Sequence, residues 1–134
     1  MQENVIENFH IWKFIRNFAN RNTMEHPKFN IILLKEADKF LSKIDGKTKQ
    51  KIILNMDLAR HTLNSDLLKR LTGDIWEFRT LYKGKQYRML AFWDKQNKID
   101  TLVVATHGFI KKVSKVPQTE IHKAEQIMKR YFNT

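Results

Sequence analysis

The segment spanning residues 74–94 constrains the fold more than any other part of the chain. It contains two runs of aromatic and β-branched residues that flank Lys83 and Gly84. Such runs around a short turn predict a β-hairpin, because glycine accepts the positive φ that a tight turn requires. A hairpin that is symmetric about this pair places Arg79 directly opposite Arg88.

The two faces of the predicted hairpin differ in chemistry, because side chains alternate between faces along a strand. One face is expected to form core and comprises Trp76, Phe78, Tyr87, Met89, Ala91 and Trp93. The other carries Arg79 and Arg88, whose like charges repel when directly opposed. An anion between the two guanidinium groups removes that repulsion, and their planar forks suit phosphate oxygens. The alternative is a solvated arginine pair with Glu77 as counter-charge.

Charge is the most informative bulk property of the chain. Lys and Arg number 25 against 14 Asp and Glu, which gives a formal net charge of +11. Residues 1–27 contain equal numbers of acidic and basic side chains, so the excess belongs to residues 28–134. Such a basic domain indicates a polyanionic partner, with nucleic acid first and an acidic protein second.

Length and composition narrow the class of protein. The 134 residues, of which 42% are hydrophobic, fit one globular domain with a core of its own. The absence of cysteine excludes disulfides and cysteine-ligated zinc. No apolar run approaches the roughly 18 residues of a membrane span. The N-terminal residues lack the basic-then-apolar layout of a signal peptide, so a cytoplasmic location is expected.

Periodicity predicts the remaining elements. They are an N-terminal helix over 4–22, a strand over 28–34, helices over 36–44 and 47–63, a connector with one helical turn over 64–73, a buried central strand over 99–107, a basic loop over 108–117 and a final helix from 118 or 119. We therefore expect an α+β fold in which an N-terminal helical extension, 1–27, precedes a β-α-α-β-β-β-α domain, 28–134. Its small, mainly antiparallel twisted sheet packs on helices.

His107 and the basic side chains near it in sequence are further candidate site residues. An unperturbed pKa of about 6.5 allows His107 to act as acid or base near neutrality. The alternative is an ordinary hydrogen bond at the end of a strand. Glu77 could serve as a base or, as the favoured alternative, orient Arg79. No histidine or carboxylate cluster has metal-ligand spacing, so neither a metal nor another cofactor is expected.

Four short motifs follow one another along the chain in a specific order and spacing. They are LTGDIWEFR at residues 71–79, YRML at 87–90, HGFIKK at 107–112 followed by Pro117, and EIHKA at 120–124. Together they resemble the RelE/ParE toxin superfamily and, within it, the HigB-like, phage-derived toxins of type II toxin-antitoxin systems. The resemblance covers residues 28–132.

The resemblance implies a RelE-like fold and a ribosome-dependent endoribonuclease that cuts mRNA without a metal and so inhibits translation. Attack by the RNA 2′-hydroxyl requires removal of its proton, stabilisation of the charged phosphorane and a proton for the leaving 5′-oxygen. The catalytic candidates are Arg79, Arg88, His107 and Lys112. The candidates for RNA phosphate contacts are Lys83, Lys85, Lys111 and Lys115.

The resemblance also implies partners, namely the ribosome with its mRNA and a cognate antitoxin, often of the helix-turn-helix type. We expect an acidic antitoxin segment to cover the arginine face or to lie along a sheet edge. Two other functions remain open. One is a ParE-like inhibitor of DNA gyrase, which needs no acid or base. The other is a catalytically inactive, basic RNA-binding module, against which the core-facing aromatic residues argue mildly.

Overall fold

The computed structural model describes residues 5–6, 27–62, 64–96 and 102–133. Its strands are β1 (Val5–Ile6), β2 (Asn30–Leu34), β3 (Leu68–Thr72), β4 (Ile75–Tyr82), β5 (Lys85–Asp94) and β6 (Leu102–Lys111). Its helices are α2 (Lys35–Lys43), α3 (Gly46–Thr62) and α4 (Gln118–Phe132). Within these ranges, no helix has the length and apolar character needed to cross a membrane.

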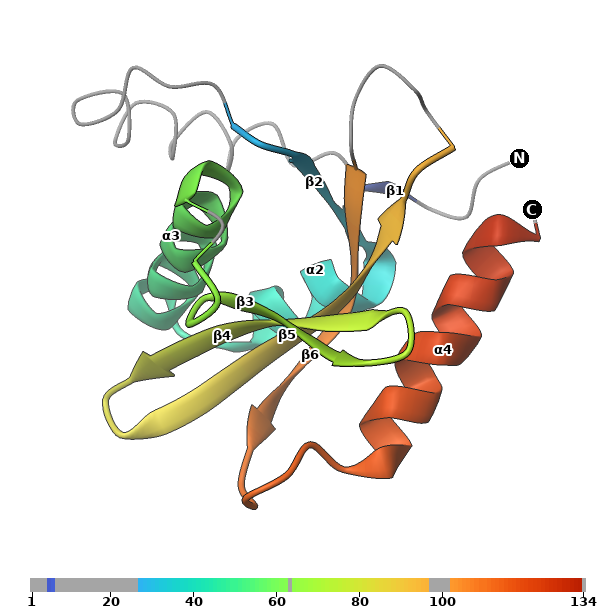
Figure 1. The fold of residues 1–134 in the computed structure, drawn as a ribbon. Helices are drawn as coiled ribbons and strands as arrows, with labels where there is room; N and C mark the ends of the chain where they lie inside the picture. Colours follow the sequence, from blue (N-terminus) through green and yellow to red (C-terminus); the bar gives the residue numbers. More distant parts are fainter. Residues whose placement is uncertain (1–4, 7–26, 63, 97–101, 134) are drawn as a thin grey trace.

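The strands form one sheet in the order β1-β2-β6-β5-β4-β3. Every neighbouring pair is antiparallel except β2 and β6, which run parallel. Helices α2 and α3 cover one face of the twisted sheet, and α4 lies across the other (Figure 1). The expected α+β class and mainly antiparallel sheet are therefore confirmed.

The hairpin of β4 and β5 has the predicted register. Arg79 lies opposite Arg88. The turn residues Lys83 and Gly84 have φ values of 50° and 77°. Two consecutive positive φ values match the twist of the flanking strands, which is why glycine is favoured in the second position. All six residues of the predicted apolar face belong to the core between the sheet and helices α2 and α3.

Three of the expected elements differ from the structure in type or in extent. Val5 and Ile6 form a strand against β2 instead of starting a helix, and the rest of the expected helix lies outside the described residues. The expected helical turn before the hairpin is the edge strand β3, because burial of Leu68 and pairing with β4 outweigh local preference. Strand β6 continues to Lys111, four residues into the expected loop, through pairing with β5.

The arginine-bearing face of the hairpin is only partly open, contrary to the expectation of a charged face. Helix α4 covers the half farther from the turn, where Ile75, Leu90 and Phe92 pack beneath it. Toward the turn the same face is uncovered, and Leu81 is 66% exposed. The position of α4 thus divides the face into a buried half and an accessible half.

Candidate functional site

A basic cavity lies where the β4–β5 turn meets the end of β6. Its volume is about 640 Å³, and its lining includes Lys85, Gln86, Lys111 and Lys112. Gln86 and Lys111 are direct partners across β5 and β6, so strand pairing brings together two segments that are distant in sequence. Three of the predicted RNA-contacting or catalytic lysines therefore converge. None of the described residues that line the cavity is acidic.

The other two predicted lysines lie near this cavity in the chain but outside its lining. Lys83 occupies the turn, and its ammonium lies 5.4 Å from the centroid of the Tyr82 ring. Lys115 is exposed in the loop between β6 and α4. Both add positive charge to the same end of the molecule.

Arg79 is the more accessible member of the arginine pair. It is half-buried on β4, on the face that carries α4. Its side chain makes no hydrogen bond or ion pair with any residue that the structure describes. Arg79 is not among the residues that line the lysine cavity. A guanidinium with unused donors can bind a phosphate through two parallel hydrogen bonds.

Arg88, by contrast, is only 3% exposed, and its donors have partners within the protein. Its Nε lies 2.7 Å from Glu77 Oε1 in an ion pair. Its Nη1 donates to the Tyr87 carbonyl at 3.1 Å, and its Nη2 donates to Gln86 Oε1 at 2.7 Å. Burial lowers the pKa of Arg88; Glu77 opposes this shift, and the charge of Arg79 adds to it. The two arginines therefore do not form the open clamp that their register predicted.

The arrangement around Arg88 also corrects the expected role of Glu77. Glu77 is 7% exposed and pairs with Arg88, not with Arg79. Gln86, which the sequence analysis did not single out, connects the buried Arg88 to the cavity. The sequence contained a signal for this contact, because Gln86 and Arg88 are two residues apart on one strand and so share a face.

His107 lies beneath α4, away from the cavity surface. It is 2% exposed, and its Nε2 lies 3.0 Å from Glu120 Oε1 while its Nδ1 lies 3.1 Å from Thr106 Oγ1. Burial lowers the pKa of His107, and its hydrogen bond to Glu120 partly opposes the shift. In this arrangement His107 ties β6 to the first turn of α4, as in the alternative interpretation of the sequence. It does not join the lysines that line the cavity.

One comparison with known proteins identifies the family. A family model described as Phage derived protein Gp49-like (DUF891) matches residues 39–129, which is most of the chain. The chain belongs to the Gp49-like family. This is a phage-derived, toxin-like family, in agreement with the sequence resemblance at that level. A comparison with curated proteins found no match.

The site of this Gp49-like protein lies within the matched residues, which run from α2 into α4. It comprises three lysines around a cavity and, outside the lining of that cavity, the half-buried Arg79, which has no partner among the described residues. Such a group can hold a phosphodiester and stabilise additional negative charge on it. A lysine ammonium can also supply a proton.

Proposed function

We propose that this protein is the toxin of a type II toxin-antitoxin system and acts as a ribosome-dependent, metal-independent mRNA endoribonuclease. The observation that carries the proposal is the convergence of Lys85, Lys111 and Lys112 around one cavity. Arg79 is half-buried on the same hairpin, directly opposite Arg88. Family membership supports the toxin class.

Arg79 and the three lysines that line the cavity each have a role in this reaction. Arg79 binds the non-bridging oxygens of the scissile phosphate and stabilises the phosphorane, while Lys85 and Lys111 hold the phosphates beside it. The 2′-oxygen attacks phosphorus and loses its proton to solvent, and the bond from phosphorus to the 5′-oxygen breaks. Lys112 donates the proton that the 5′-oxygen acquires. The products are a 2′,3′-cyclic phosphate and a free 5′-hydroxyl.

Arg88 and His107 support this site from within the protein. The ion pair with Glu77 and the hydrogen bond to Gln86 hold Arg88 behind the cavity wall. Its positive charge adds to the local potential without direct contact to RNA. His107 positions α4, which bounds the accessible half of the face.

Mapping the 5′ ends of cellular mRNA after tightly controlled expression tests the proposal. The wild-type protein should produce new 5′ ends within translated codons. Arg79→Ala and Lys112→Ala should remove most of them, whereas the control Lys39→Ala should not, because Lys39 is exposed on α2. New ends that persist in both site variants would contradict the catalytic roles.

A second candidate function, inhibition of DNA gyrase by binding, is favoured by one observation. The described lining of the cavity contains neither an imidazole nor a carboxylate that could remove a proton. Growth arrest with DNA damage signalling and no new mRNA ends would select this function. RNA binding without arrest would instead select the inactive binding module.

An antitoxin is proposed to cover this same end of the molecule. The lysines around the cavity are flanked by two exposed apolar side chains, Leu81 at 66% and Val113 at 59%. An acidic, amphipathic antitoxin segment would pair with both features. In a cognate pair, Leu81→Asp should weaken binding and restore growth arrest in the presence of antitoxin. Unchanged neutralisation would place the antitoxin elsewhere.

A further inference from the structure

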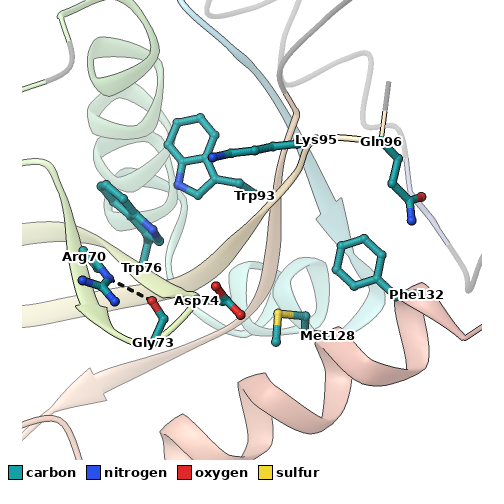
Figure 2. A pocket seen from close by; sticks show the side chains of 9 residues that line it. All are labelled: Arg70, Gly73, Asp74, Trp76, Trp93, Lys95, Gln96, Met128 and Phe132. Carbon is teal, nitrogen blue, oxygen red and sulfur yellow. Dashed lines mark hydrogen bonds between the residues drawn. The ribbon is translucent and has the colours of Figure 1, made fainter. Parts of the chain in front are cut away.

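A second cavity lies at the opposite end of the β4–β5 hairpin from the turn. Its volume is about 950 Å³, and we call it the tryptophan pocket after Trp76 and Trp93 in its lining (Figure 2). Strand β4 has eight residues, each of which advances the chain by roughly 3.3 Å, so the two ends of the hairpin are separated by about 26 Å. The pocket is therefore distinct from the basic cavity and takes no part in the proposed cleavage.

Planar rings form much of the pocket wall. Trp76 and Trp93 are half-buried, with ring centroids 5.5 Å apart and planes at 78°. Trp93 also packs edge-on against Phe29 at 5.1 Å, which holds its ring in place. Met128 and Phe132 of α4 line the pocket as well (Figure 2). The sequence analysis assigned both tryptophans wholly to the core, whereas the structure leaves part of each facing a cavity.

Polar and charged groups surround these rings. Arg70 donates from Nε to the Gly73 carbonyl at 2.8 Å, which orients its guanidinium (Figure 2). Its Nη1 and Nη2 make no hydrogen bond within the described ranges. Lys95 is exposed in the same lining, with Asp74 and Gln96. The pocket thus offers two cations, one carboxylate and one amide around an aromatic wall.

The geometry points to a nucleobase with an attached phosphate as the ligand of the tryptophan pocket. The base packs against Trp76 and Trp93, because every kind of base stacks favourably on aromatic side chains. Arg70 and Lys95 hold the phosphate, because an uncharged apolar ligand would leave these two cations without a counter-charge. Gln96 and Asp74 are placed to hydrogen-bond the polar edge of the base. The ligand is either a free nucleotide or a nucleotide of an RNA strand.

Tryptophan fluorescence gives a direct test that needs neither a ribosome nor the proposed cleavage. The chain contains three tryptophans, so Trp12→Phe leaves only the two that line the pocket. Titrating the full-length Trp12→Phe protein with adenosine monophosphate should quench its fluorescence saturably. The paired change Arg70→Gln with Lys95→Gln should weaken binding by roughly tenfold or more. The control Lys39→Gln should leave affinity unchanged.

A short single-stranded RNA, titrated in parallel, distinguishes the two sources of the ligand. Saturable quenching by both ligands supports a site for free nucleotides, and quenching by RNA alone supports a site for a base within a strand. No quenching by either ligand would overturn the inference. Equal affinity of the wild-type and Arg70→Gln/Lys95→Gln pockets in folded protein would also overturn it. Failure of mRNA cleavage in cells would leave this result unaffected.

Discussion

At the scale of single residues, Arg79 and Arg88 show how a shared position in the sheet can lead to different roles. They are direct cross-strand partners on one face of the hairpin. Arg88 is buried and contacts Glu77 and Gln86, whereas Arg79 is half-buried with no partner among the described residues. The buried arginine is therefore part of the support, and the accessible one is the candidate for substrate contact.

Replacing Arg88 should affect stability before it affects activity. Arg88→Ala leaves the Glu77 carboxylate buried without its counter-charge, which should lower the free energy of unfolding by about 3–5 kcal/mol. Replacing both partners, Arg88→Met with Glu77→Leu, should recover most of this loss. Urea unfolding followed by circular dichroism measures both changes. A loss below about 1 kcal/mol in the single variant would show that the ion pair has little structural importance.

His107 should make stability depend on pH. Because burial holds its folded-state pKa below 6.5, the unfolded chain takes up a proton first as the pH falls. Stability is therefore lost on acidification from about pH 6.5 down to the folded-state pKa, by at most about 1.4 kcal/mol per pH unit. The charges that act on the pKa of His107 are those of Glu120 and Lys123 of α4 and Glu36 of α2.

Comparing the wild type with His107→Gln isolates this contribution. The difference in unfolding free energy between the two proteins should narrow as the pH falls from 7 toward 5, because only the wild type has the buried imidazole. Thermal or urea unfolding across this range provides the measurement. A difference that is constant with pH would show that burial does not perturb His107.

At the scale of elements, the packing of α2 on β6 depends on the absence of a side chain at Gly108. A Cβ at this position would collide with the Phe40 ring of α2 and with Met89 of β5. Lack of space for a side chain, and not backbone conformation, requires glycine here, since Gly108 does not have a positive φ. It explains why a glycine interrupts a strand of otherwise larger residues.

Gly108→Ala should therefore destabilise the protein by about 1–3 kcal/mol, the usual range for overpacking a core. Shortening the opposing side chain, Phe40→Leu, should relieve part of the strain, so the double variant should lose less than the sum of the two single changes. Chemical denaturation of the four proteins forms a double-mutant cycle. Strict additivity would argue against the predicted collision.

At the scale of the whole molecule, the two cavities lie at opposite ends of the central hairpin, and α4 lines the cavity that contains the tryptophans. The net charge of +11 alone predicts affinity for polyanions without indicating where they bind. The structure concentrates lysines at the turn end and tryptophans at the other. Phosphate contacts should therefore be concentrated at the turn end.

Salt dependence of RNA binding tests this placement. Each lysine that neutralises a phosphate contributes about 0.7 to the slope of log affinity against log salt for a single strand. Replacing Lys85, Lys111 and Lys112 with glutamine should therefore reduce the slope by roughly 2, whereas Lys39→Gln should leave it nearly unchanged. Fluorescence anisotropy of a labelled single strand at several salt concentrations supplies the slopes. Equal slopes for all three proteins would place the RNA elsewhere.

The sequence by itself determined the hairpin, its register and its apolar face, because alternation and turn chemistry are local properties of neighbouring residues. It also determined helices α2, α3 and α4 and the basic character of the chain. The tertiary structure alone decided that β3 is a strand, that α4 covers His107, and that Glu77 pairs with the buried Arg88. These outcomes depend on which distant segment covers each face, and burial and partner choice follow from that packing and not from local pattern.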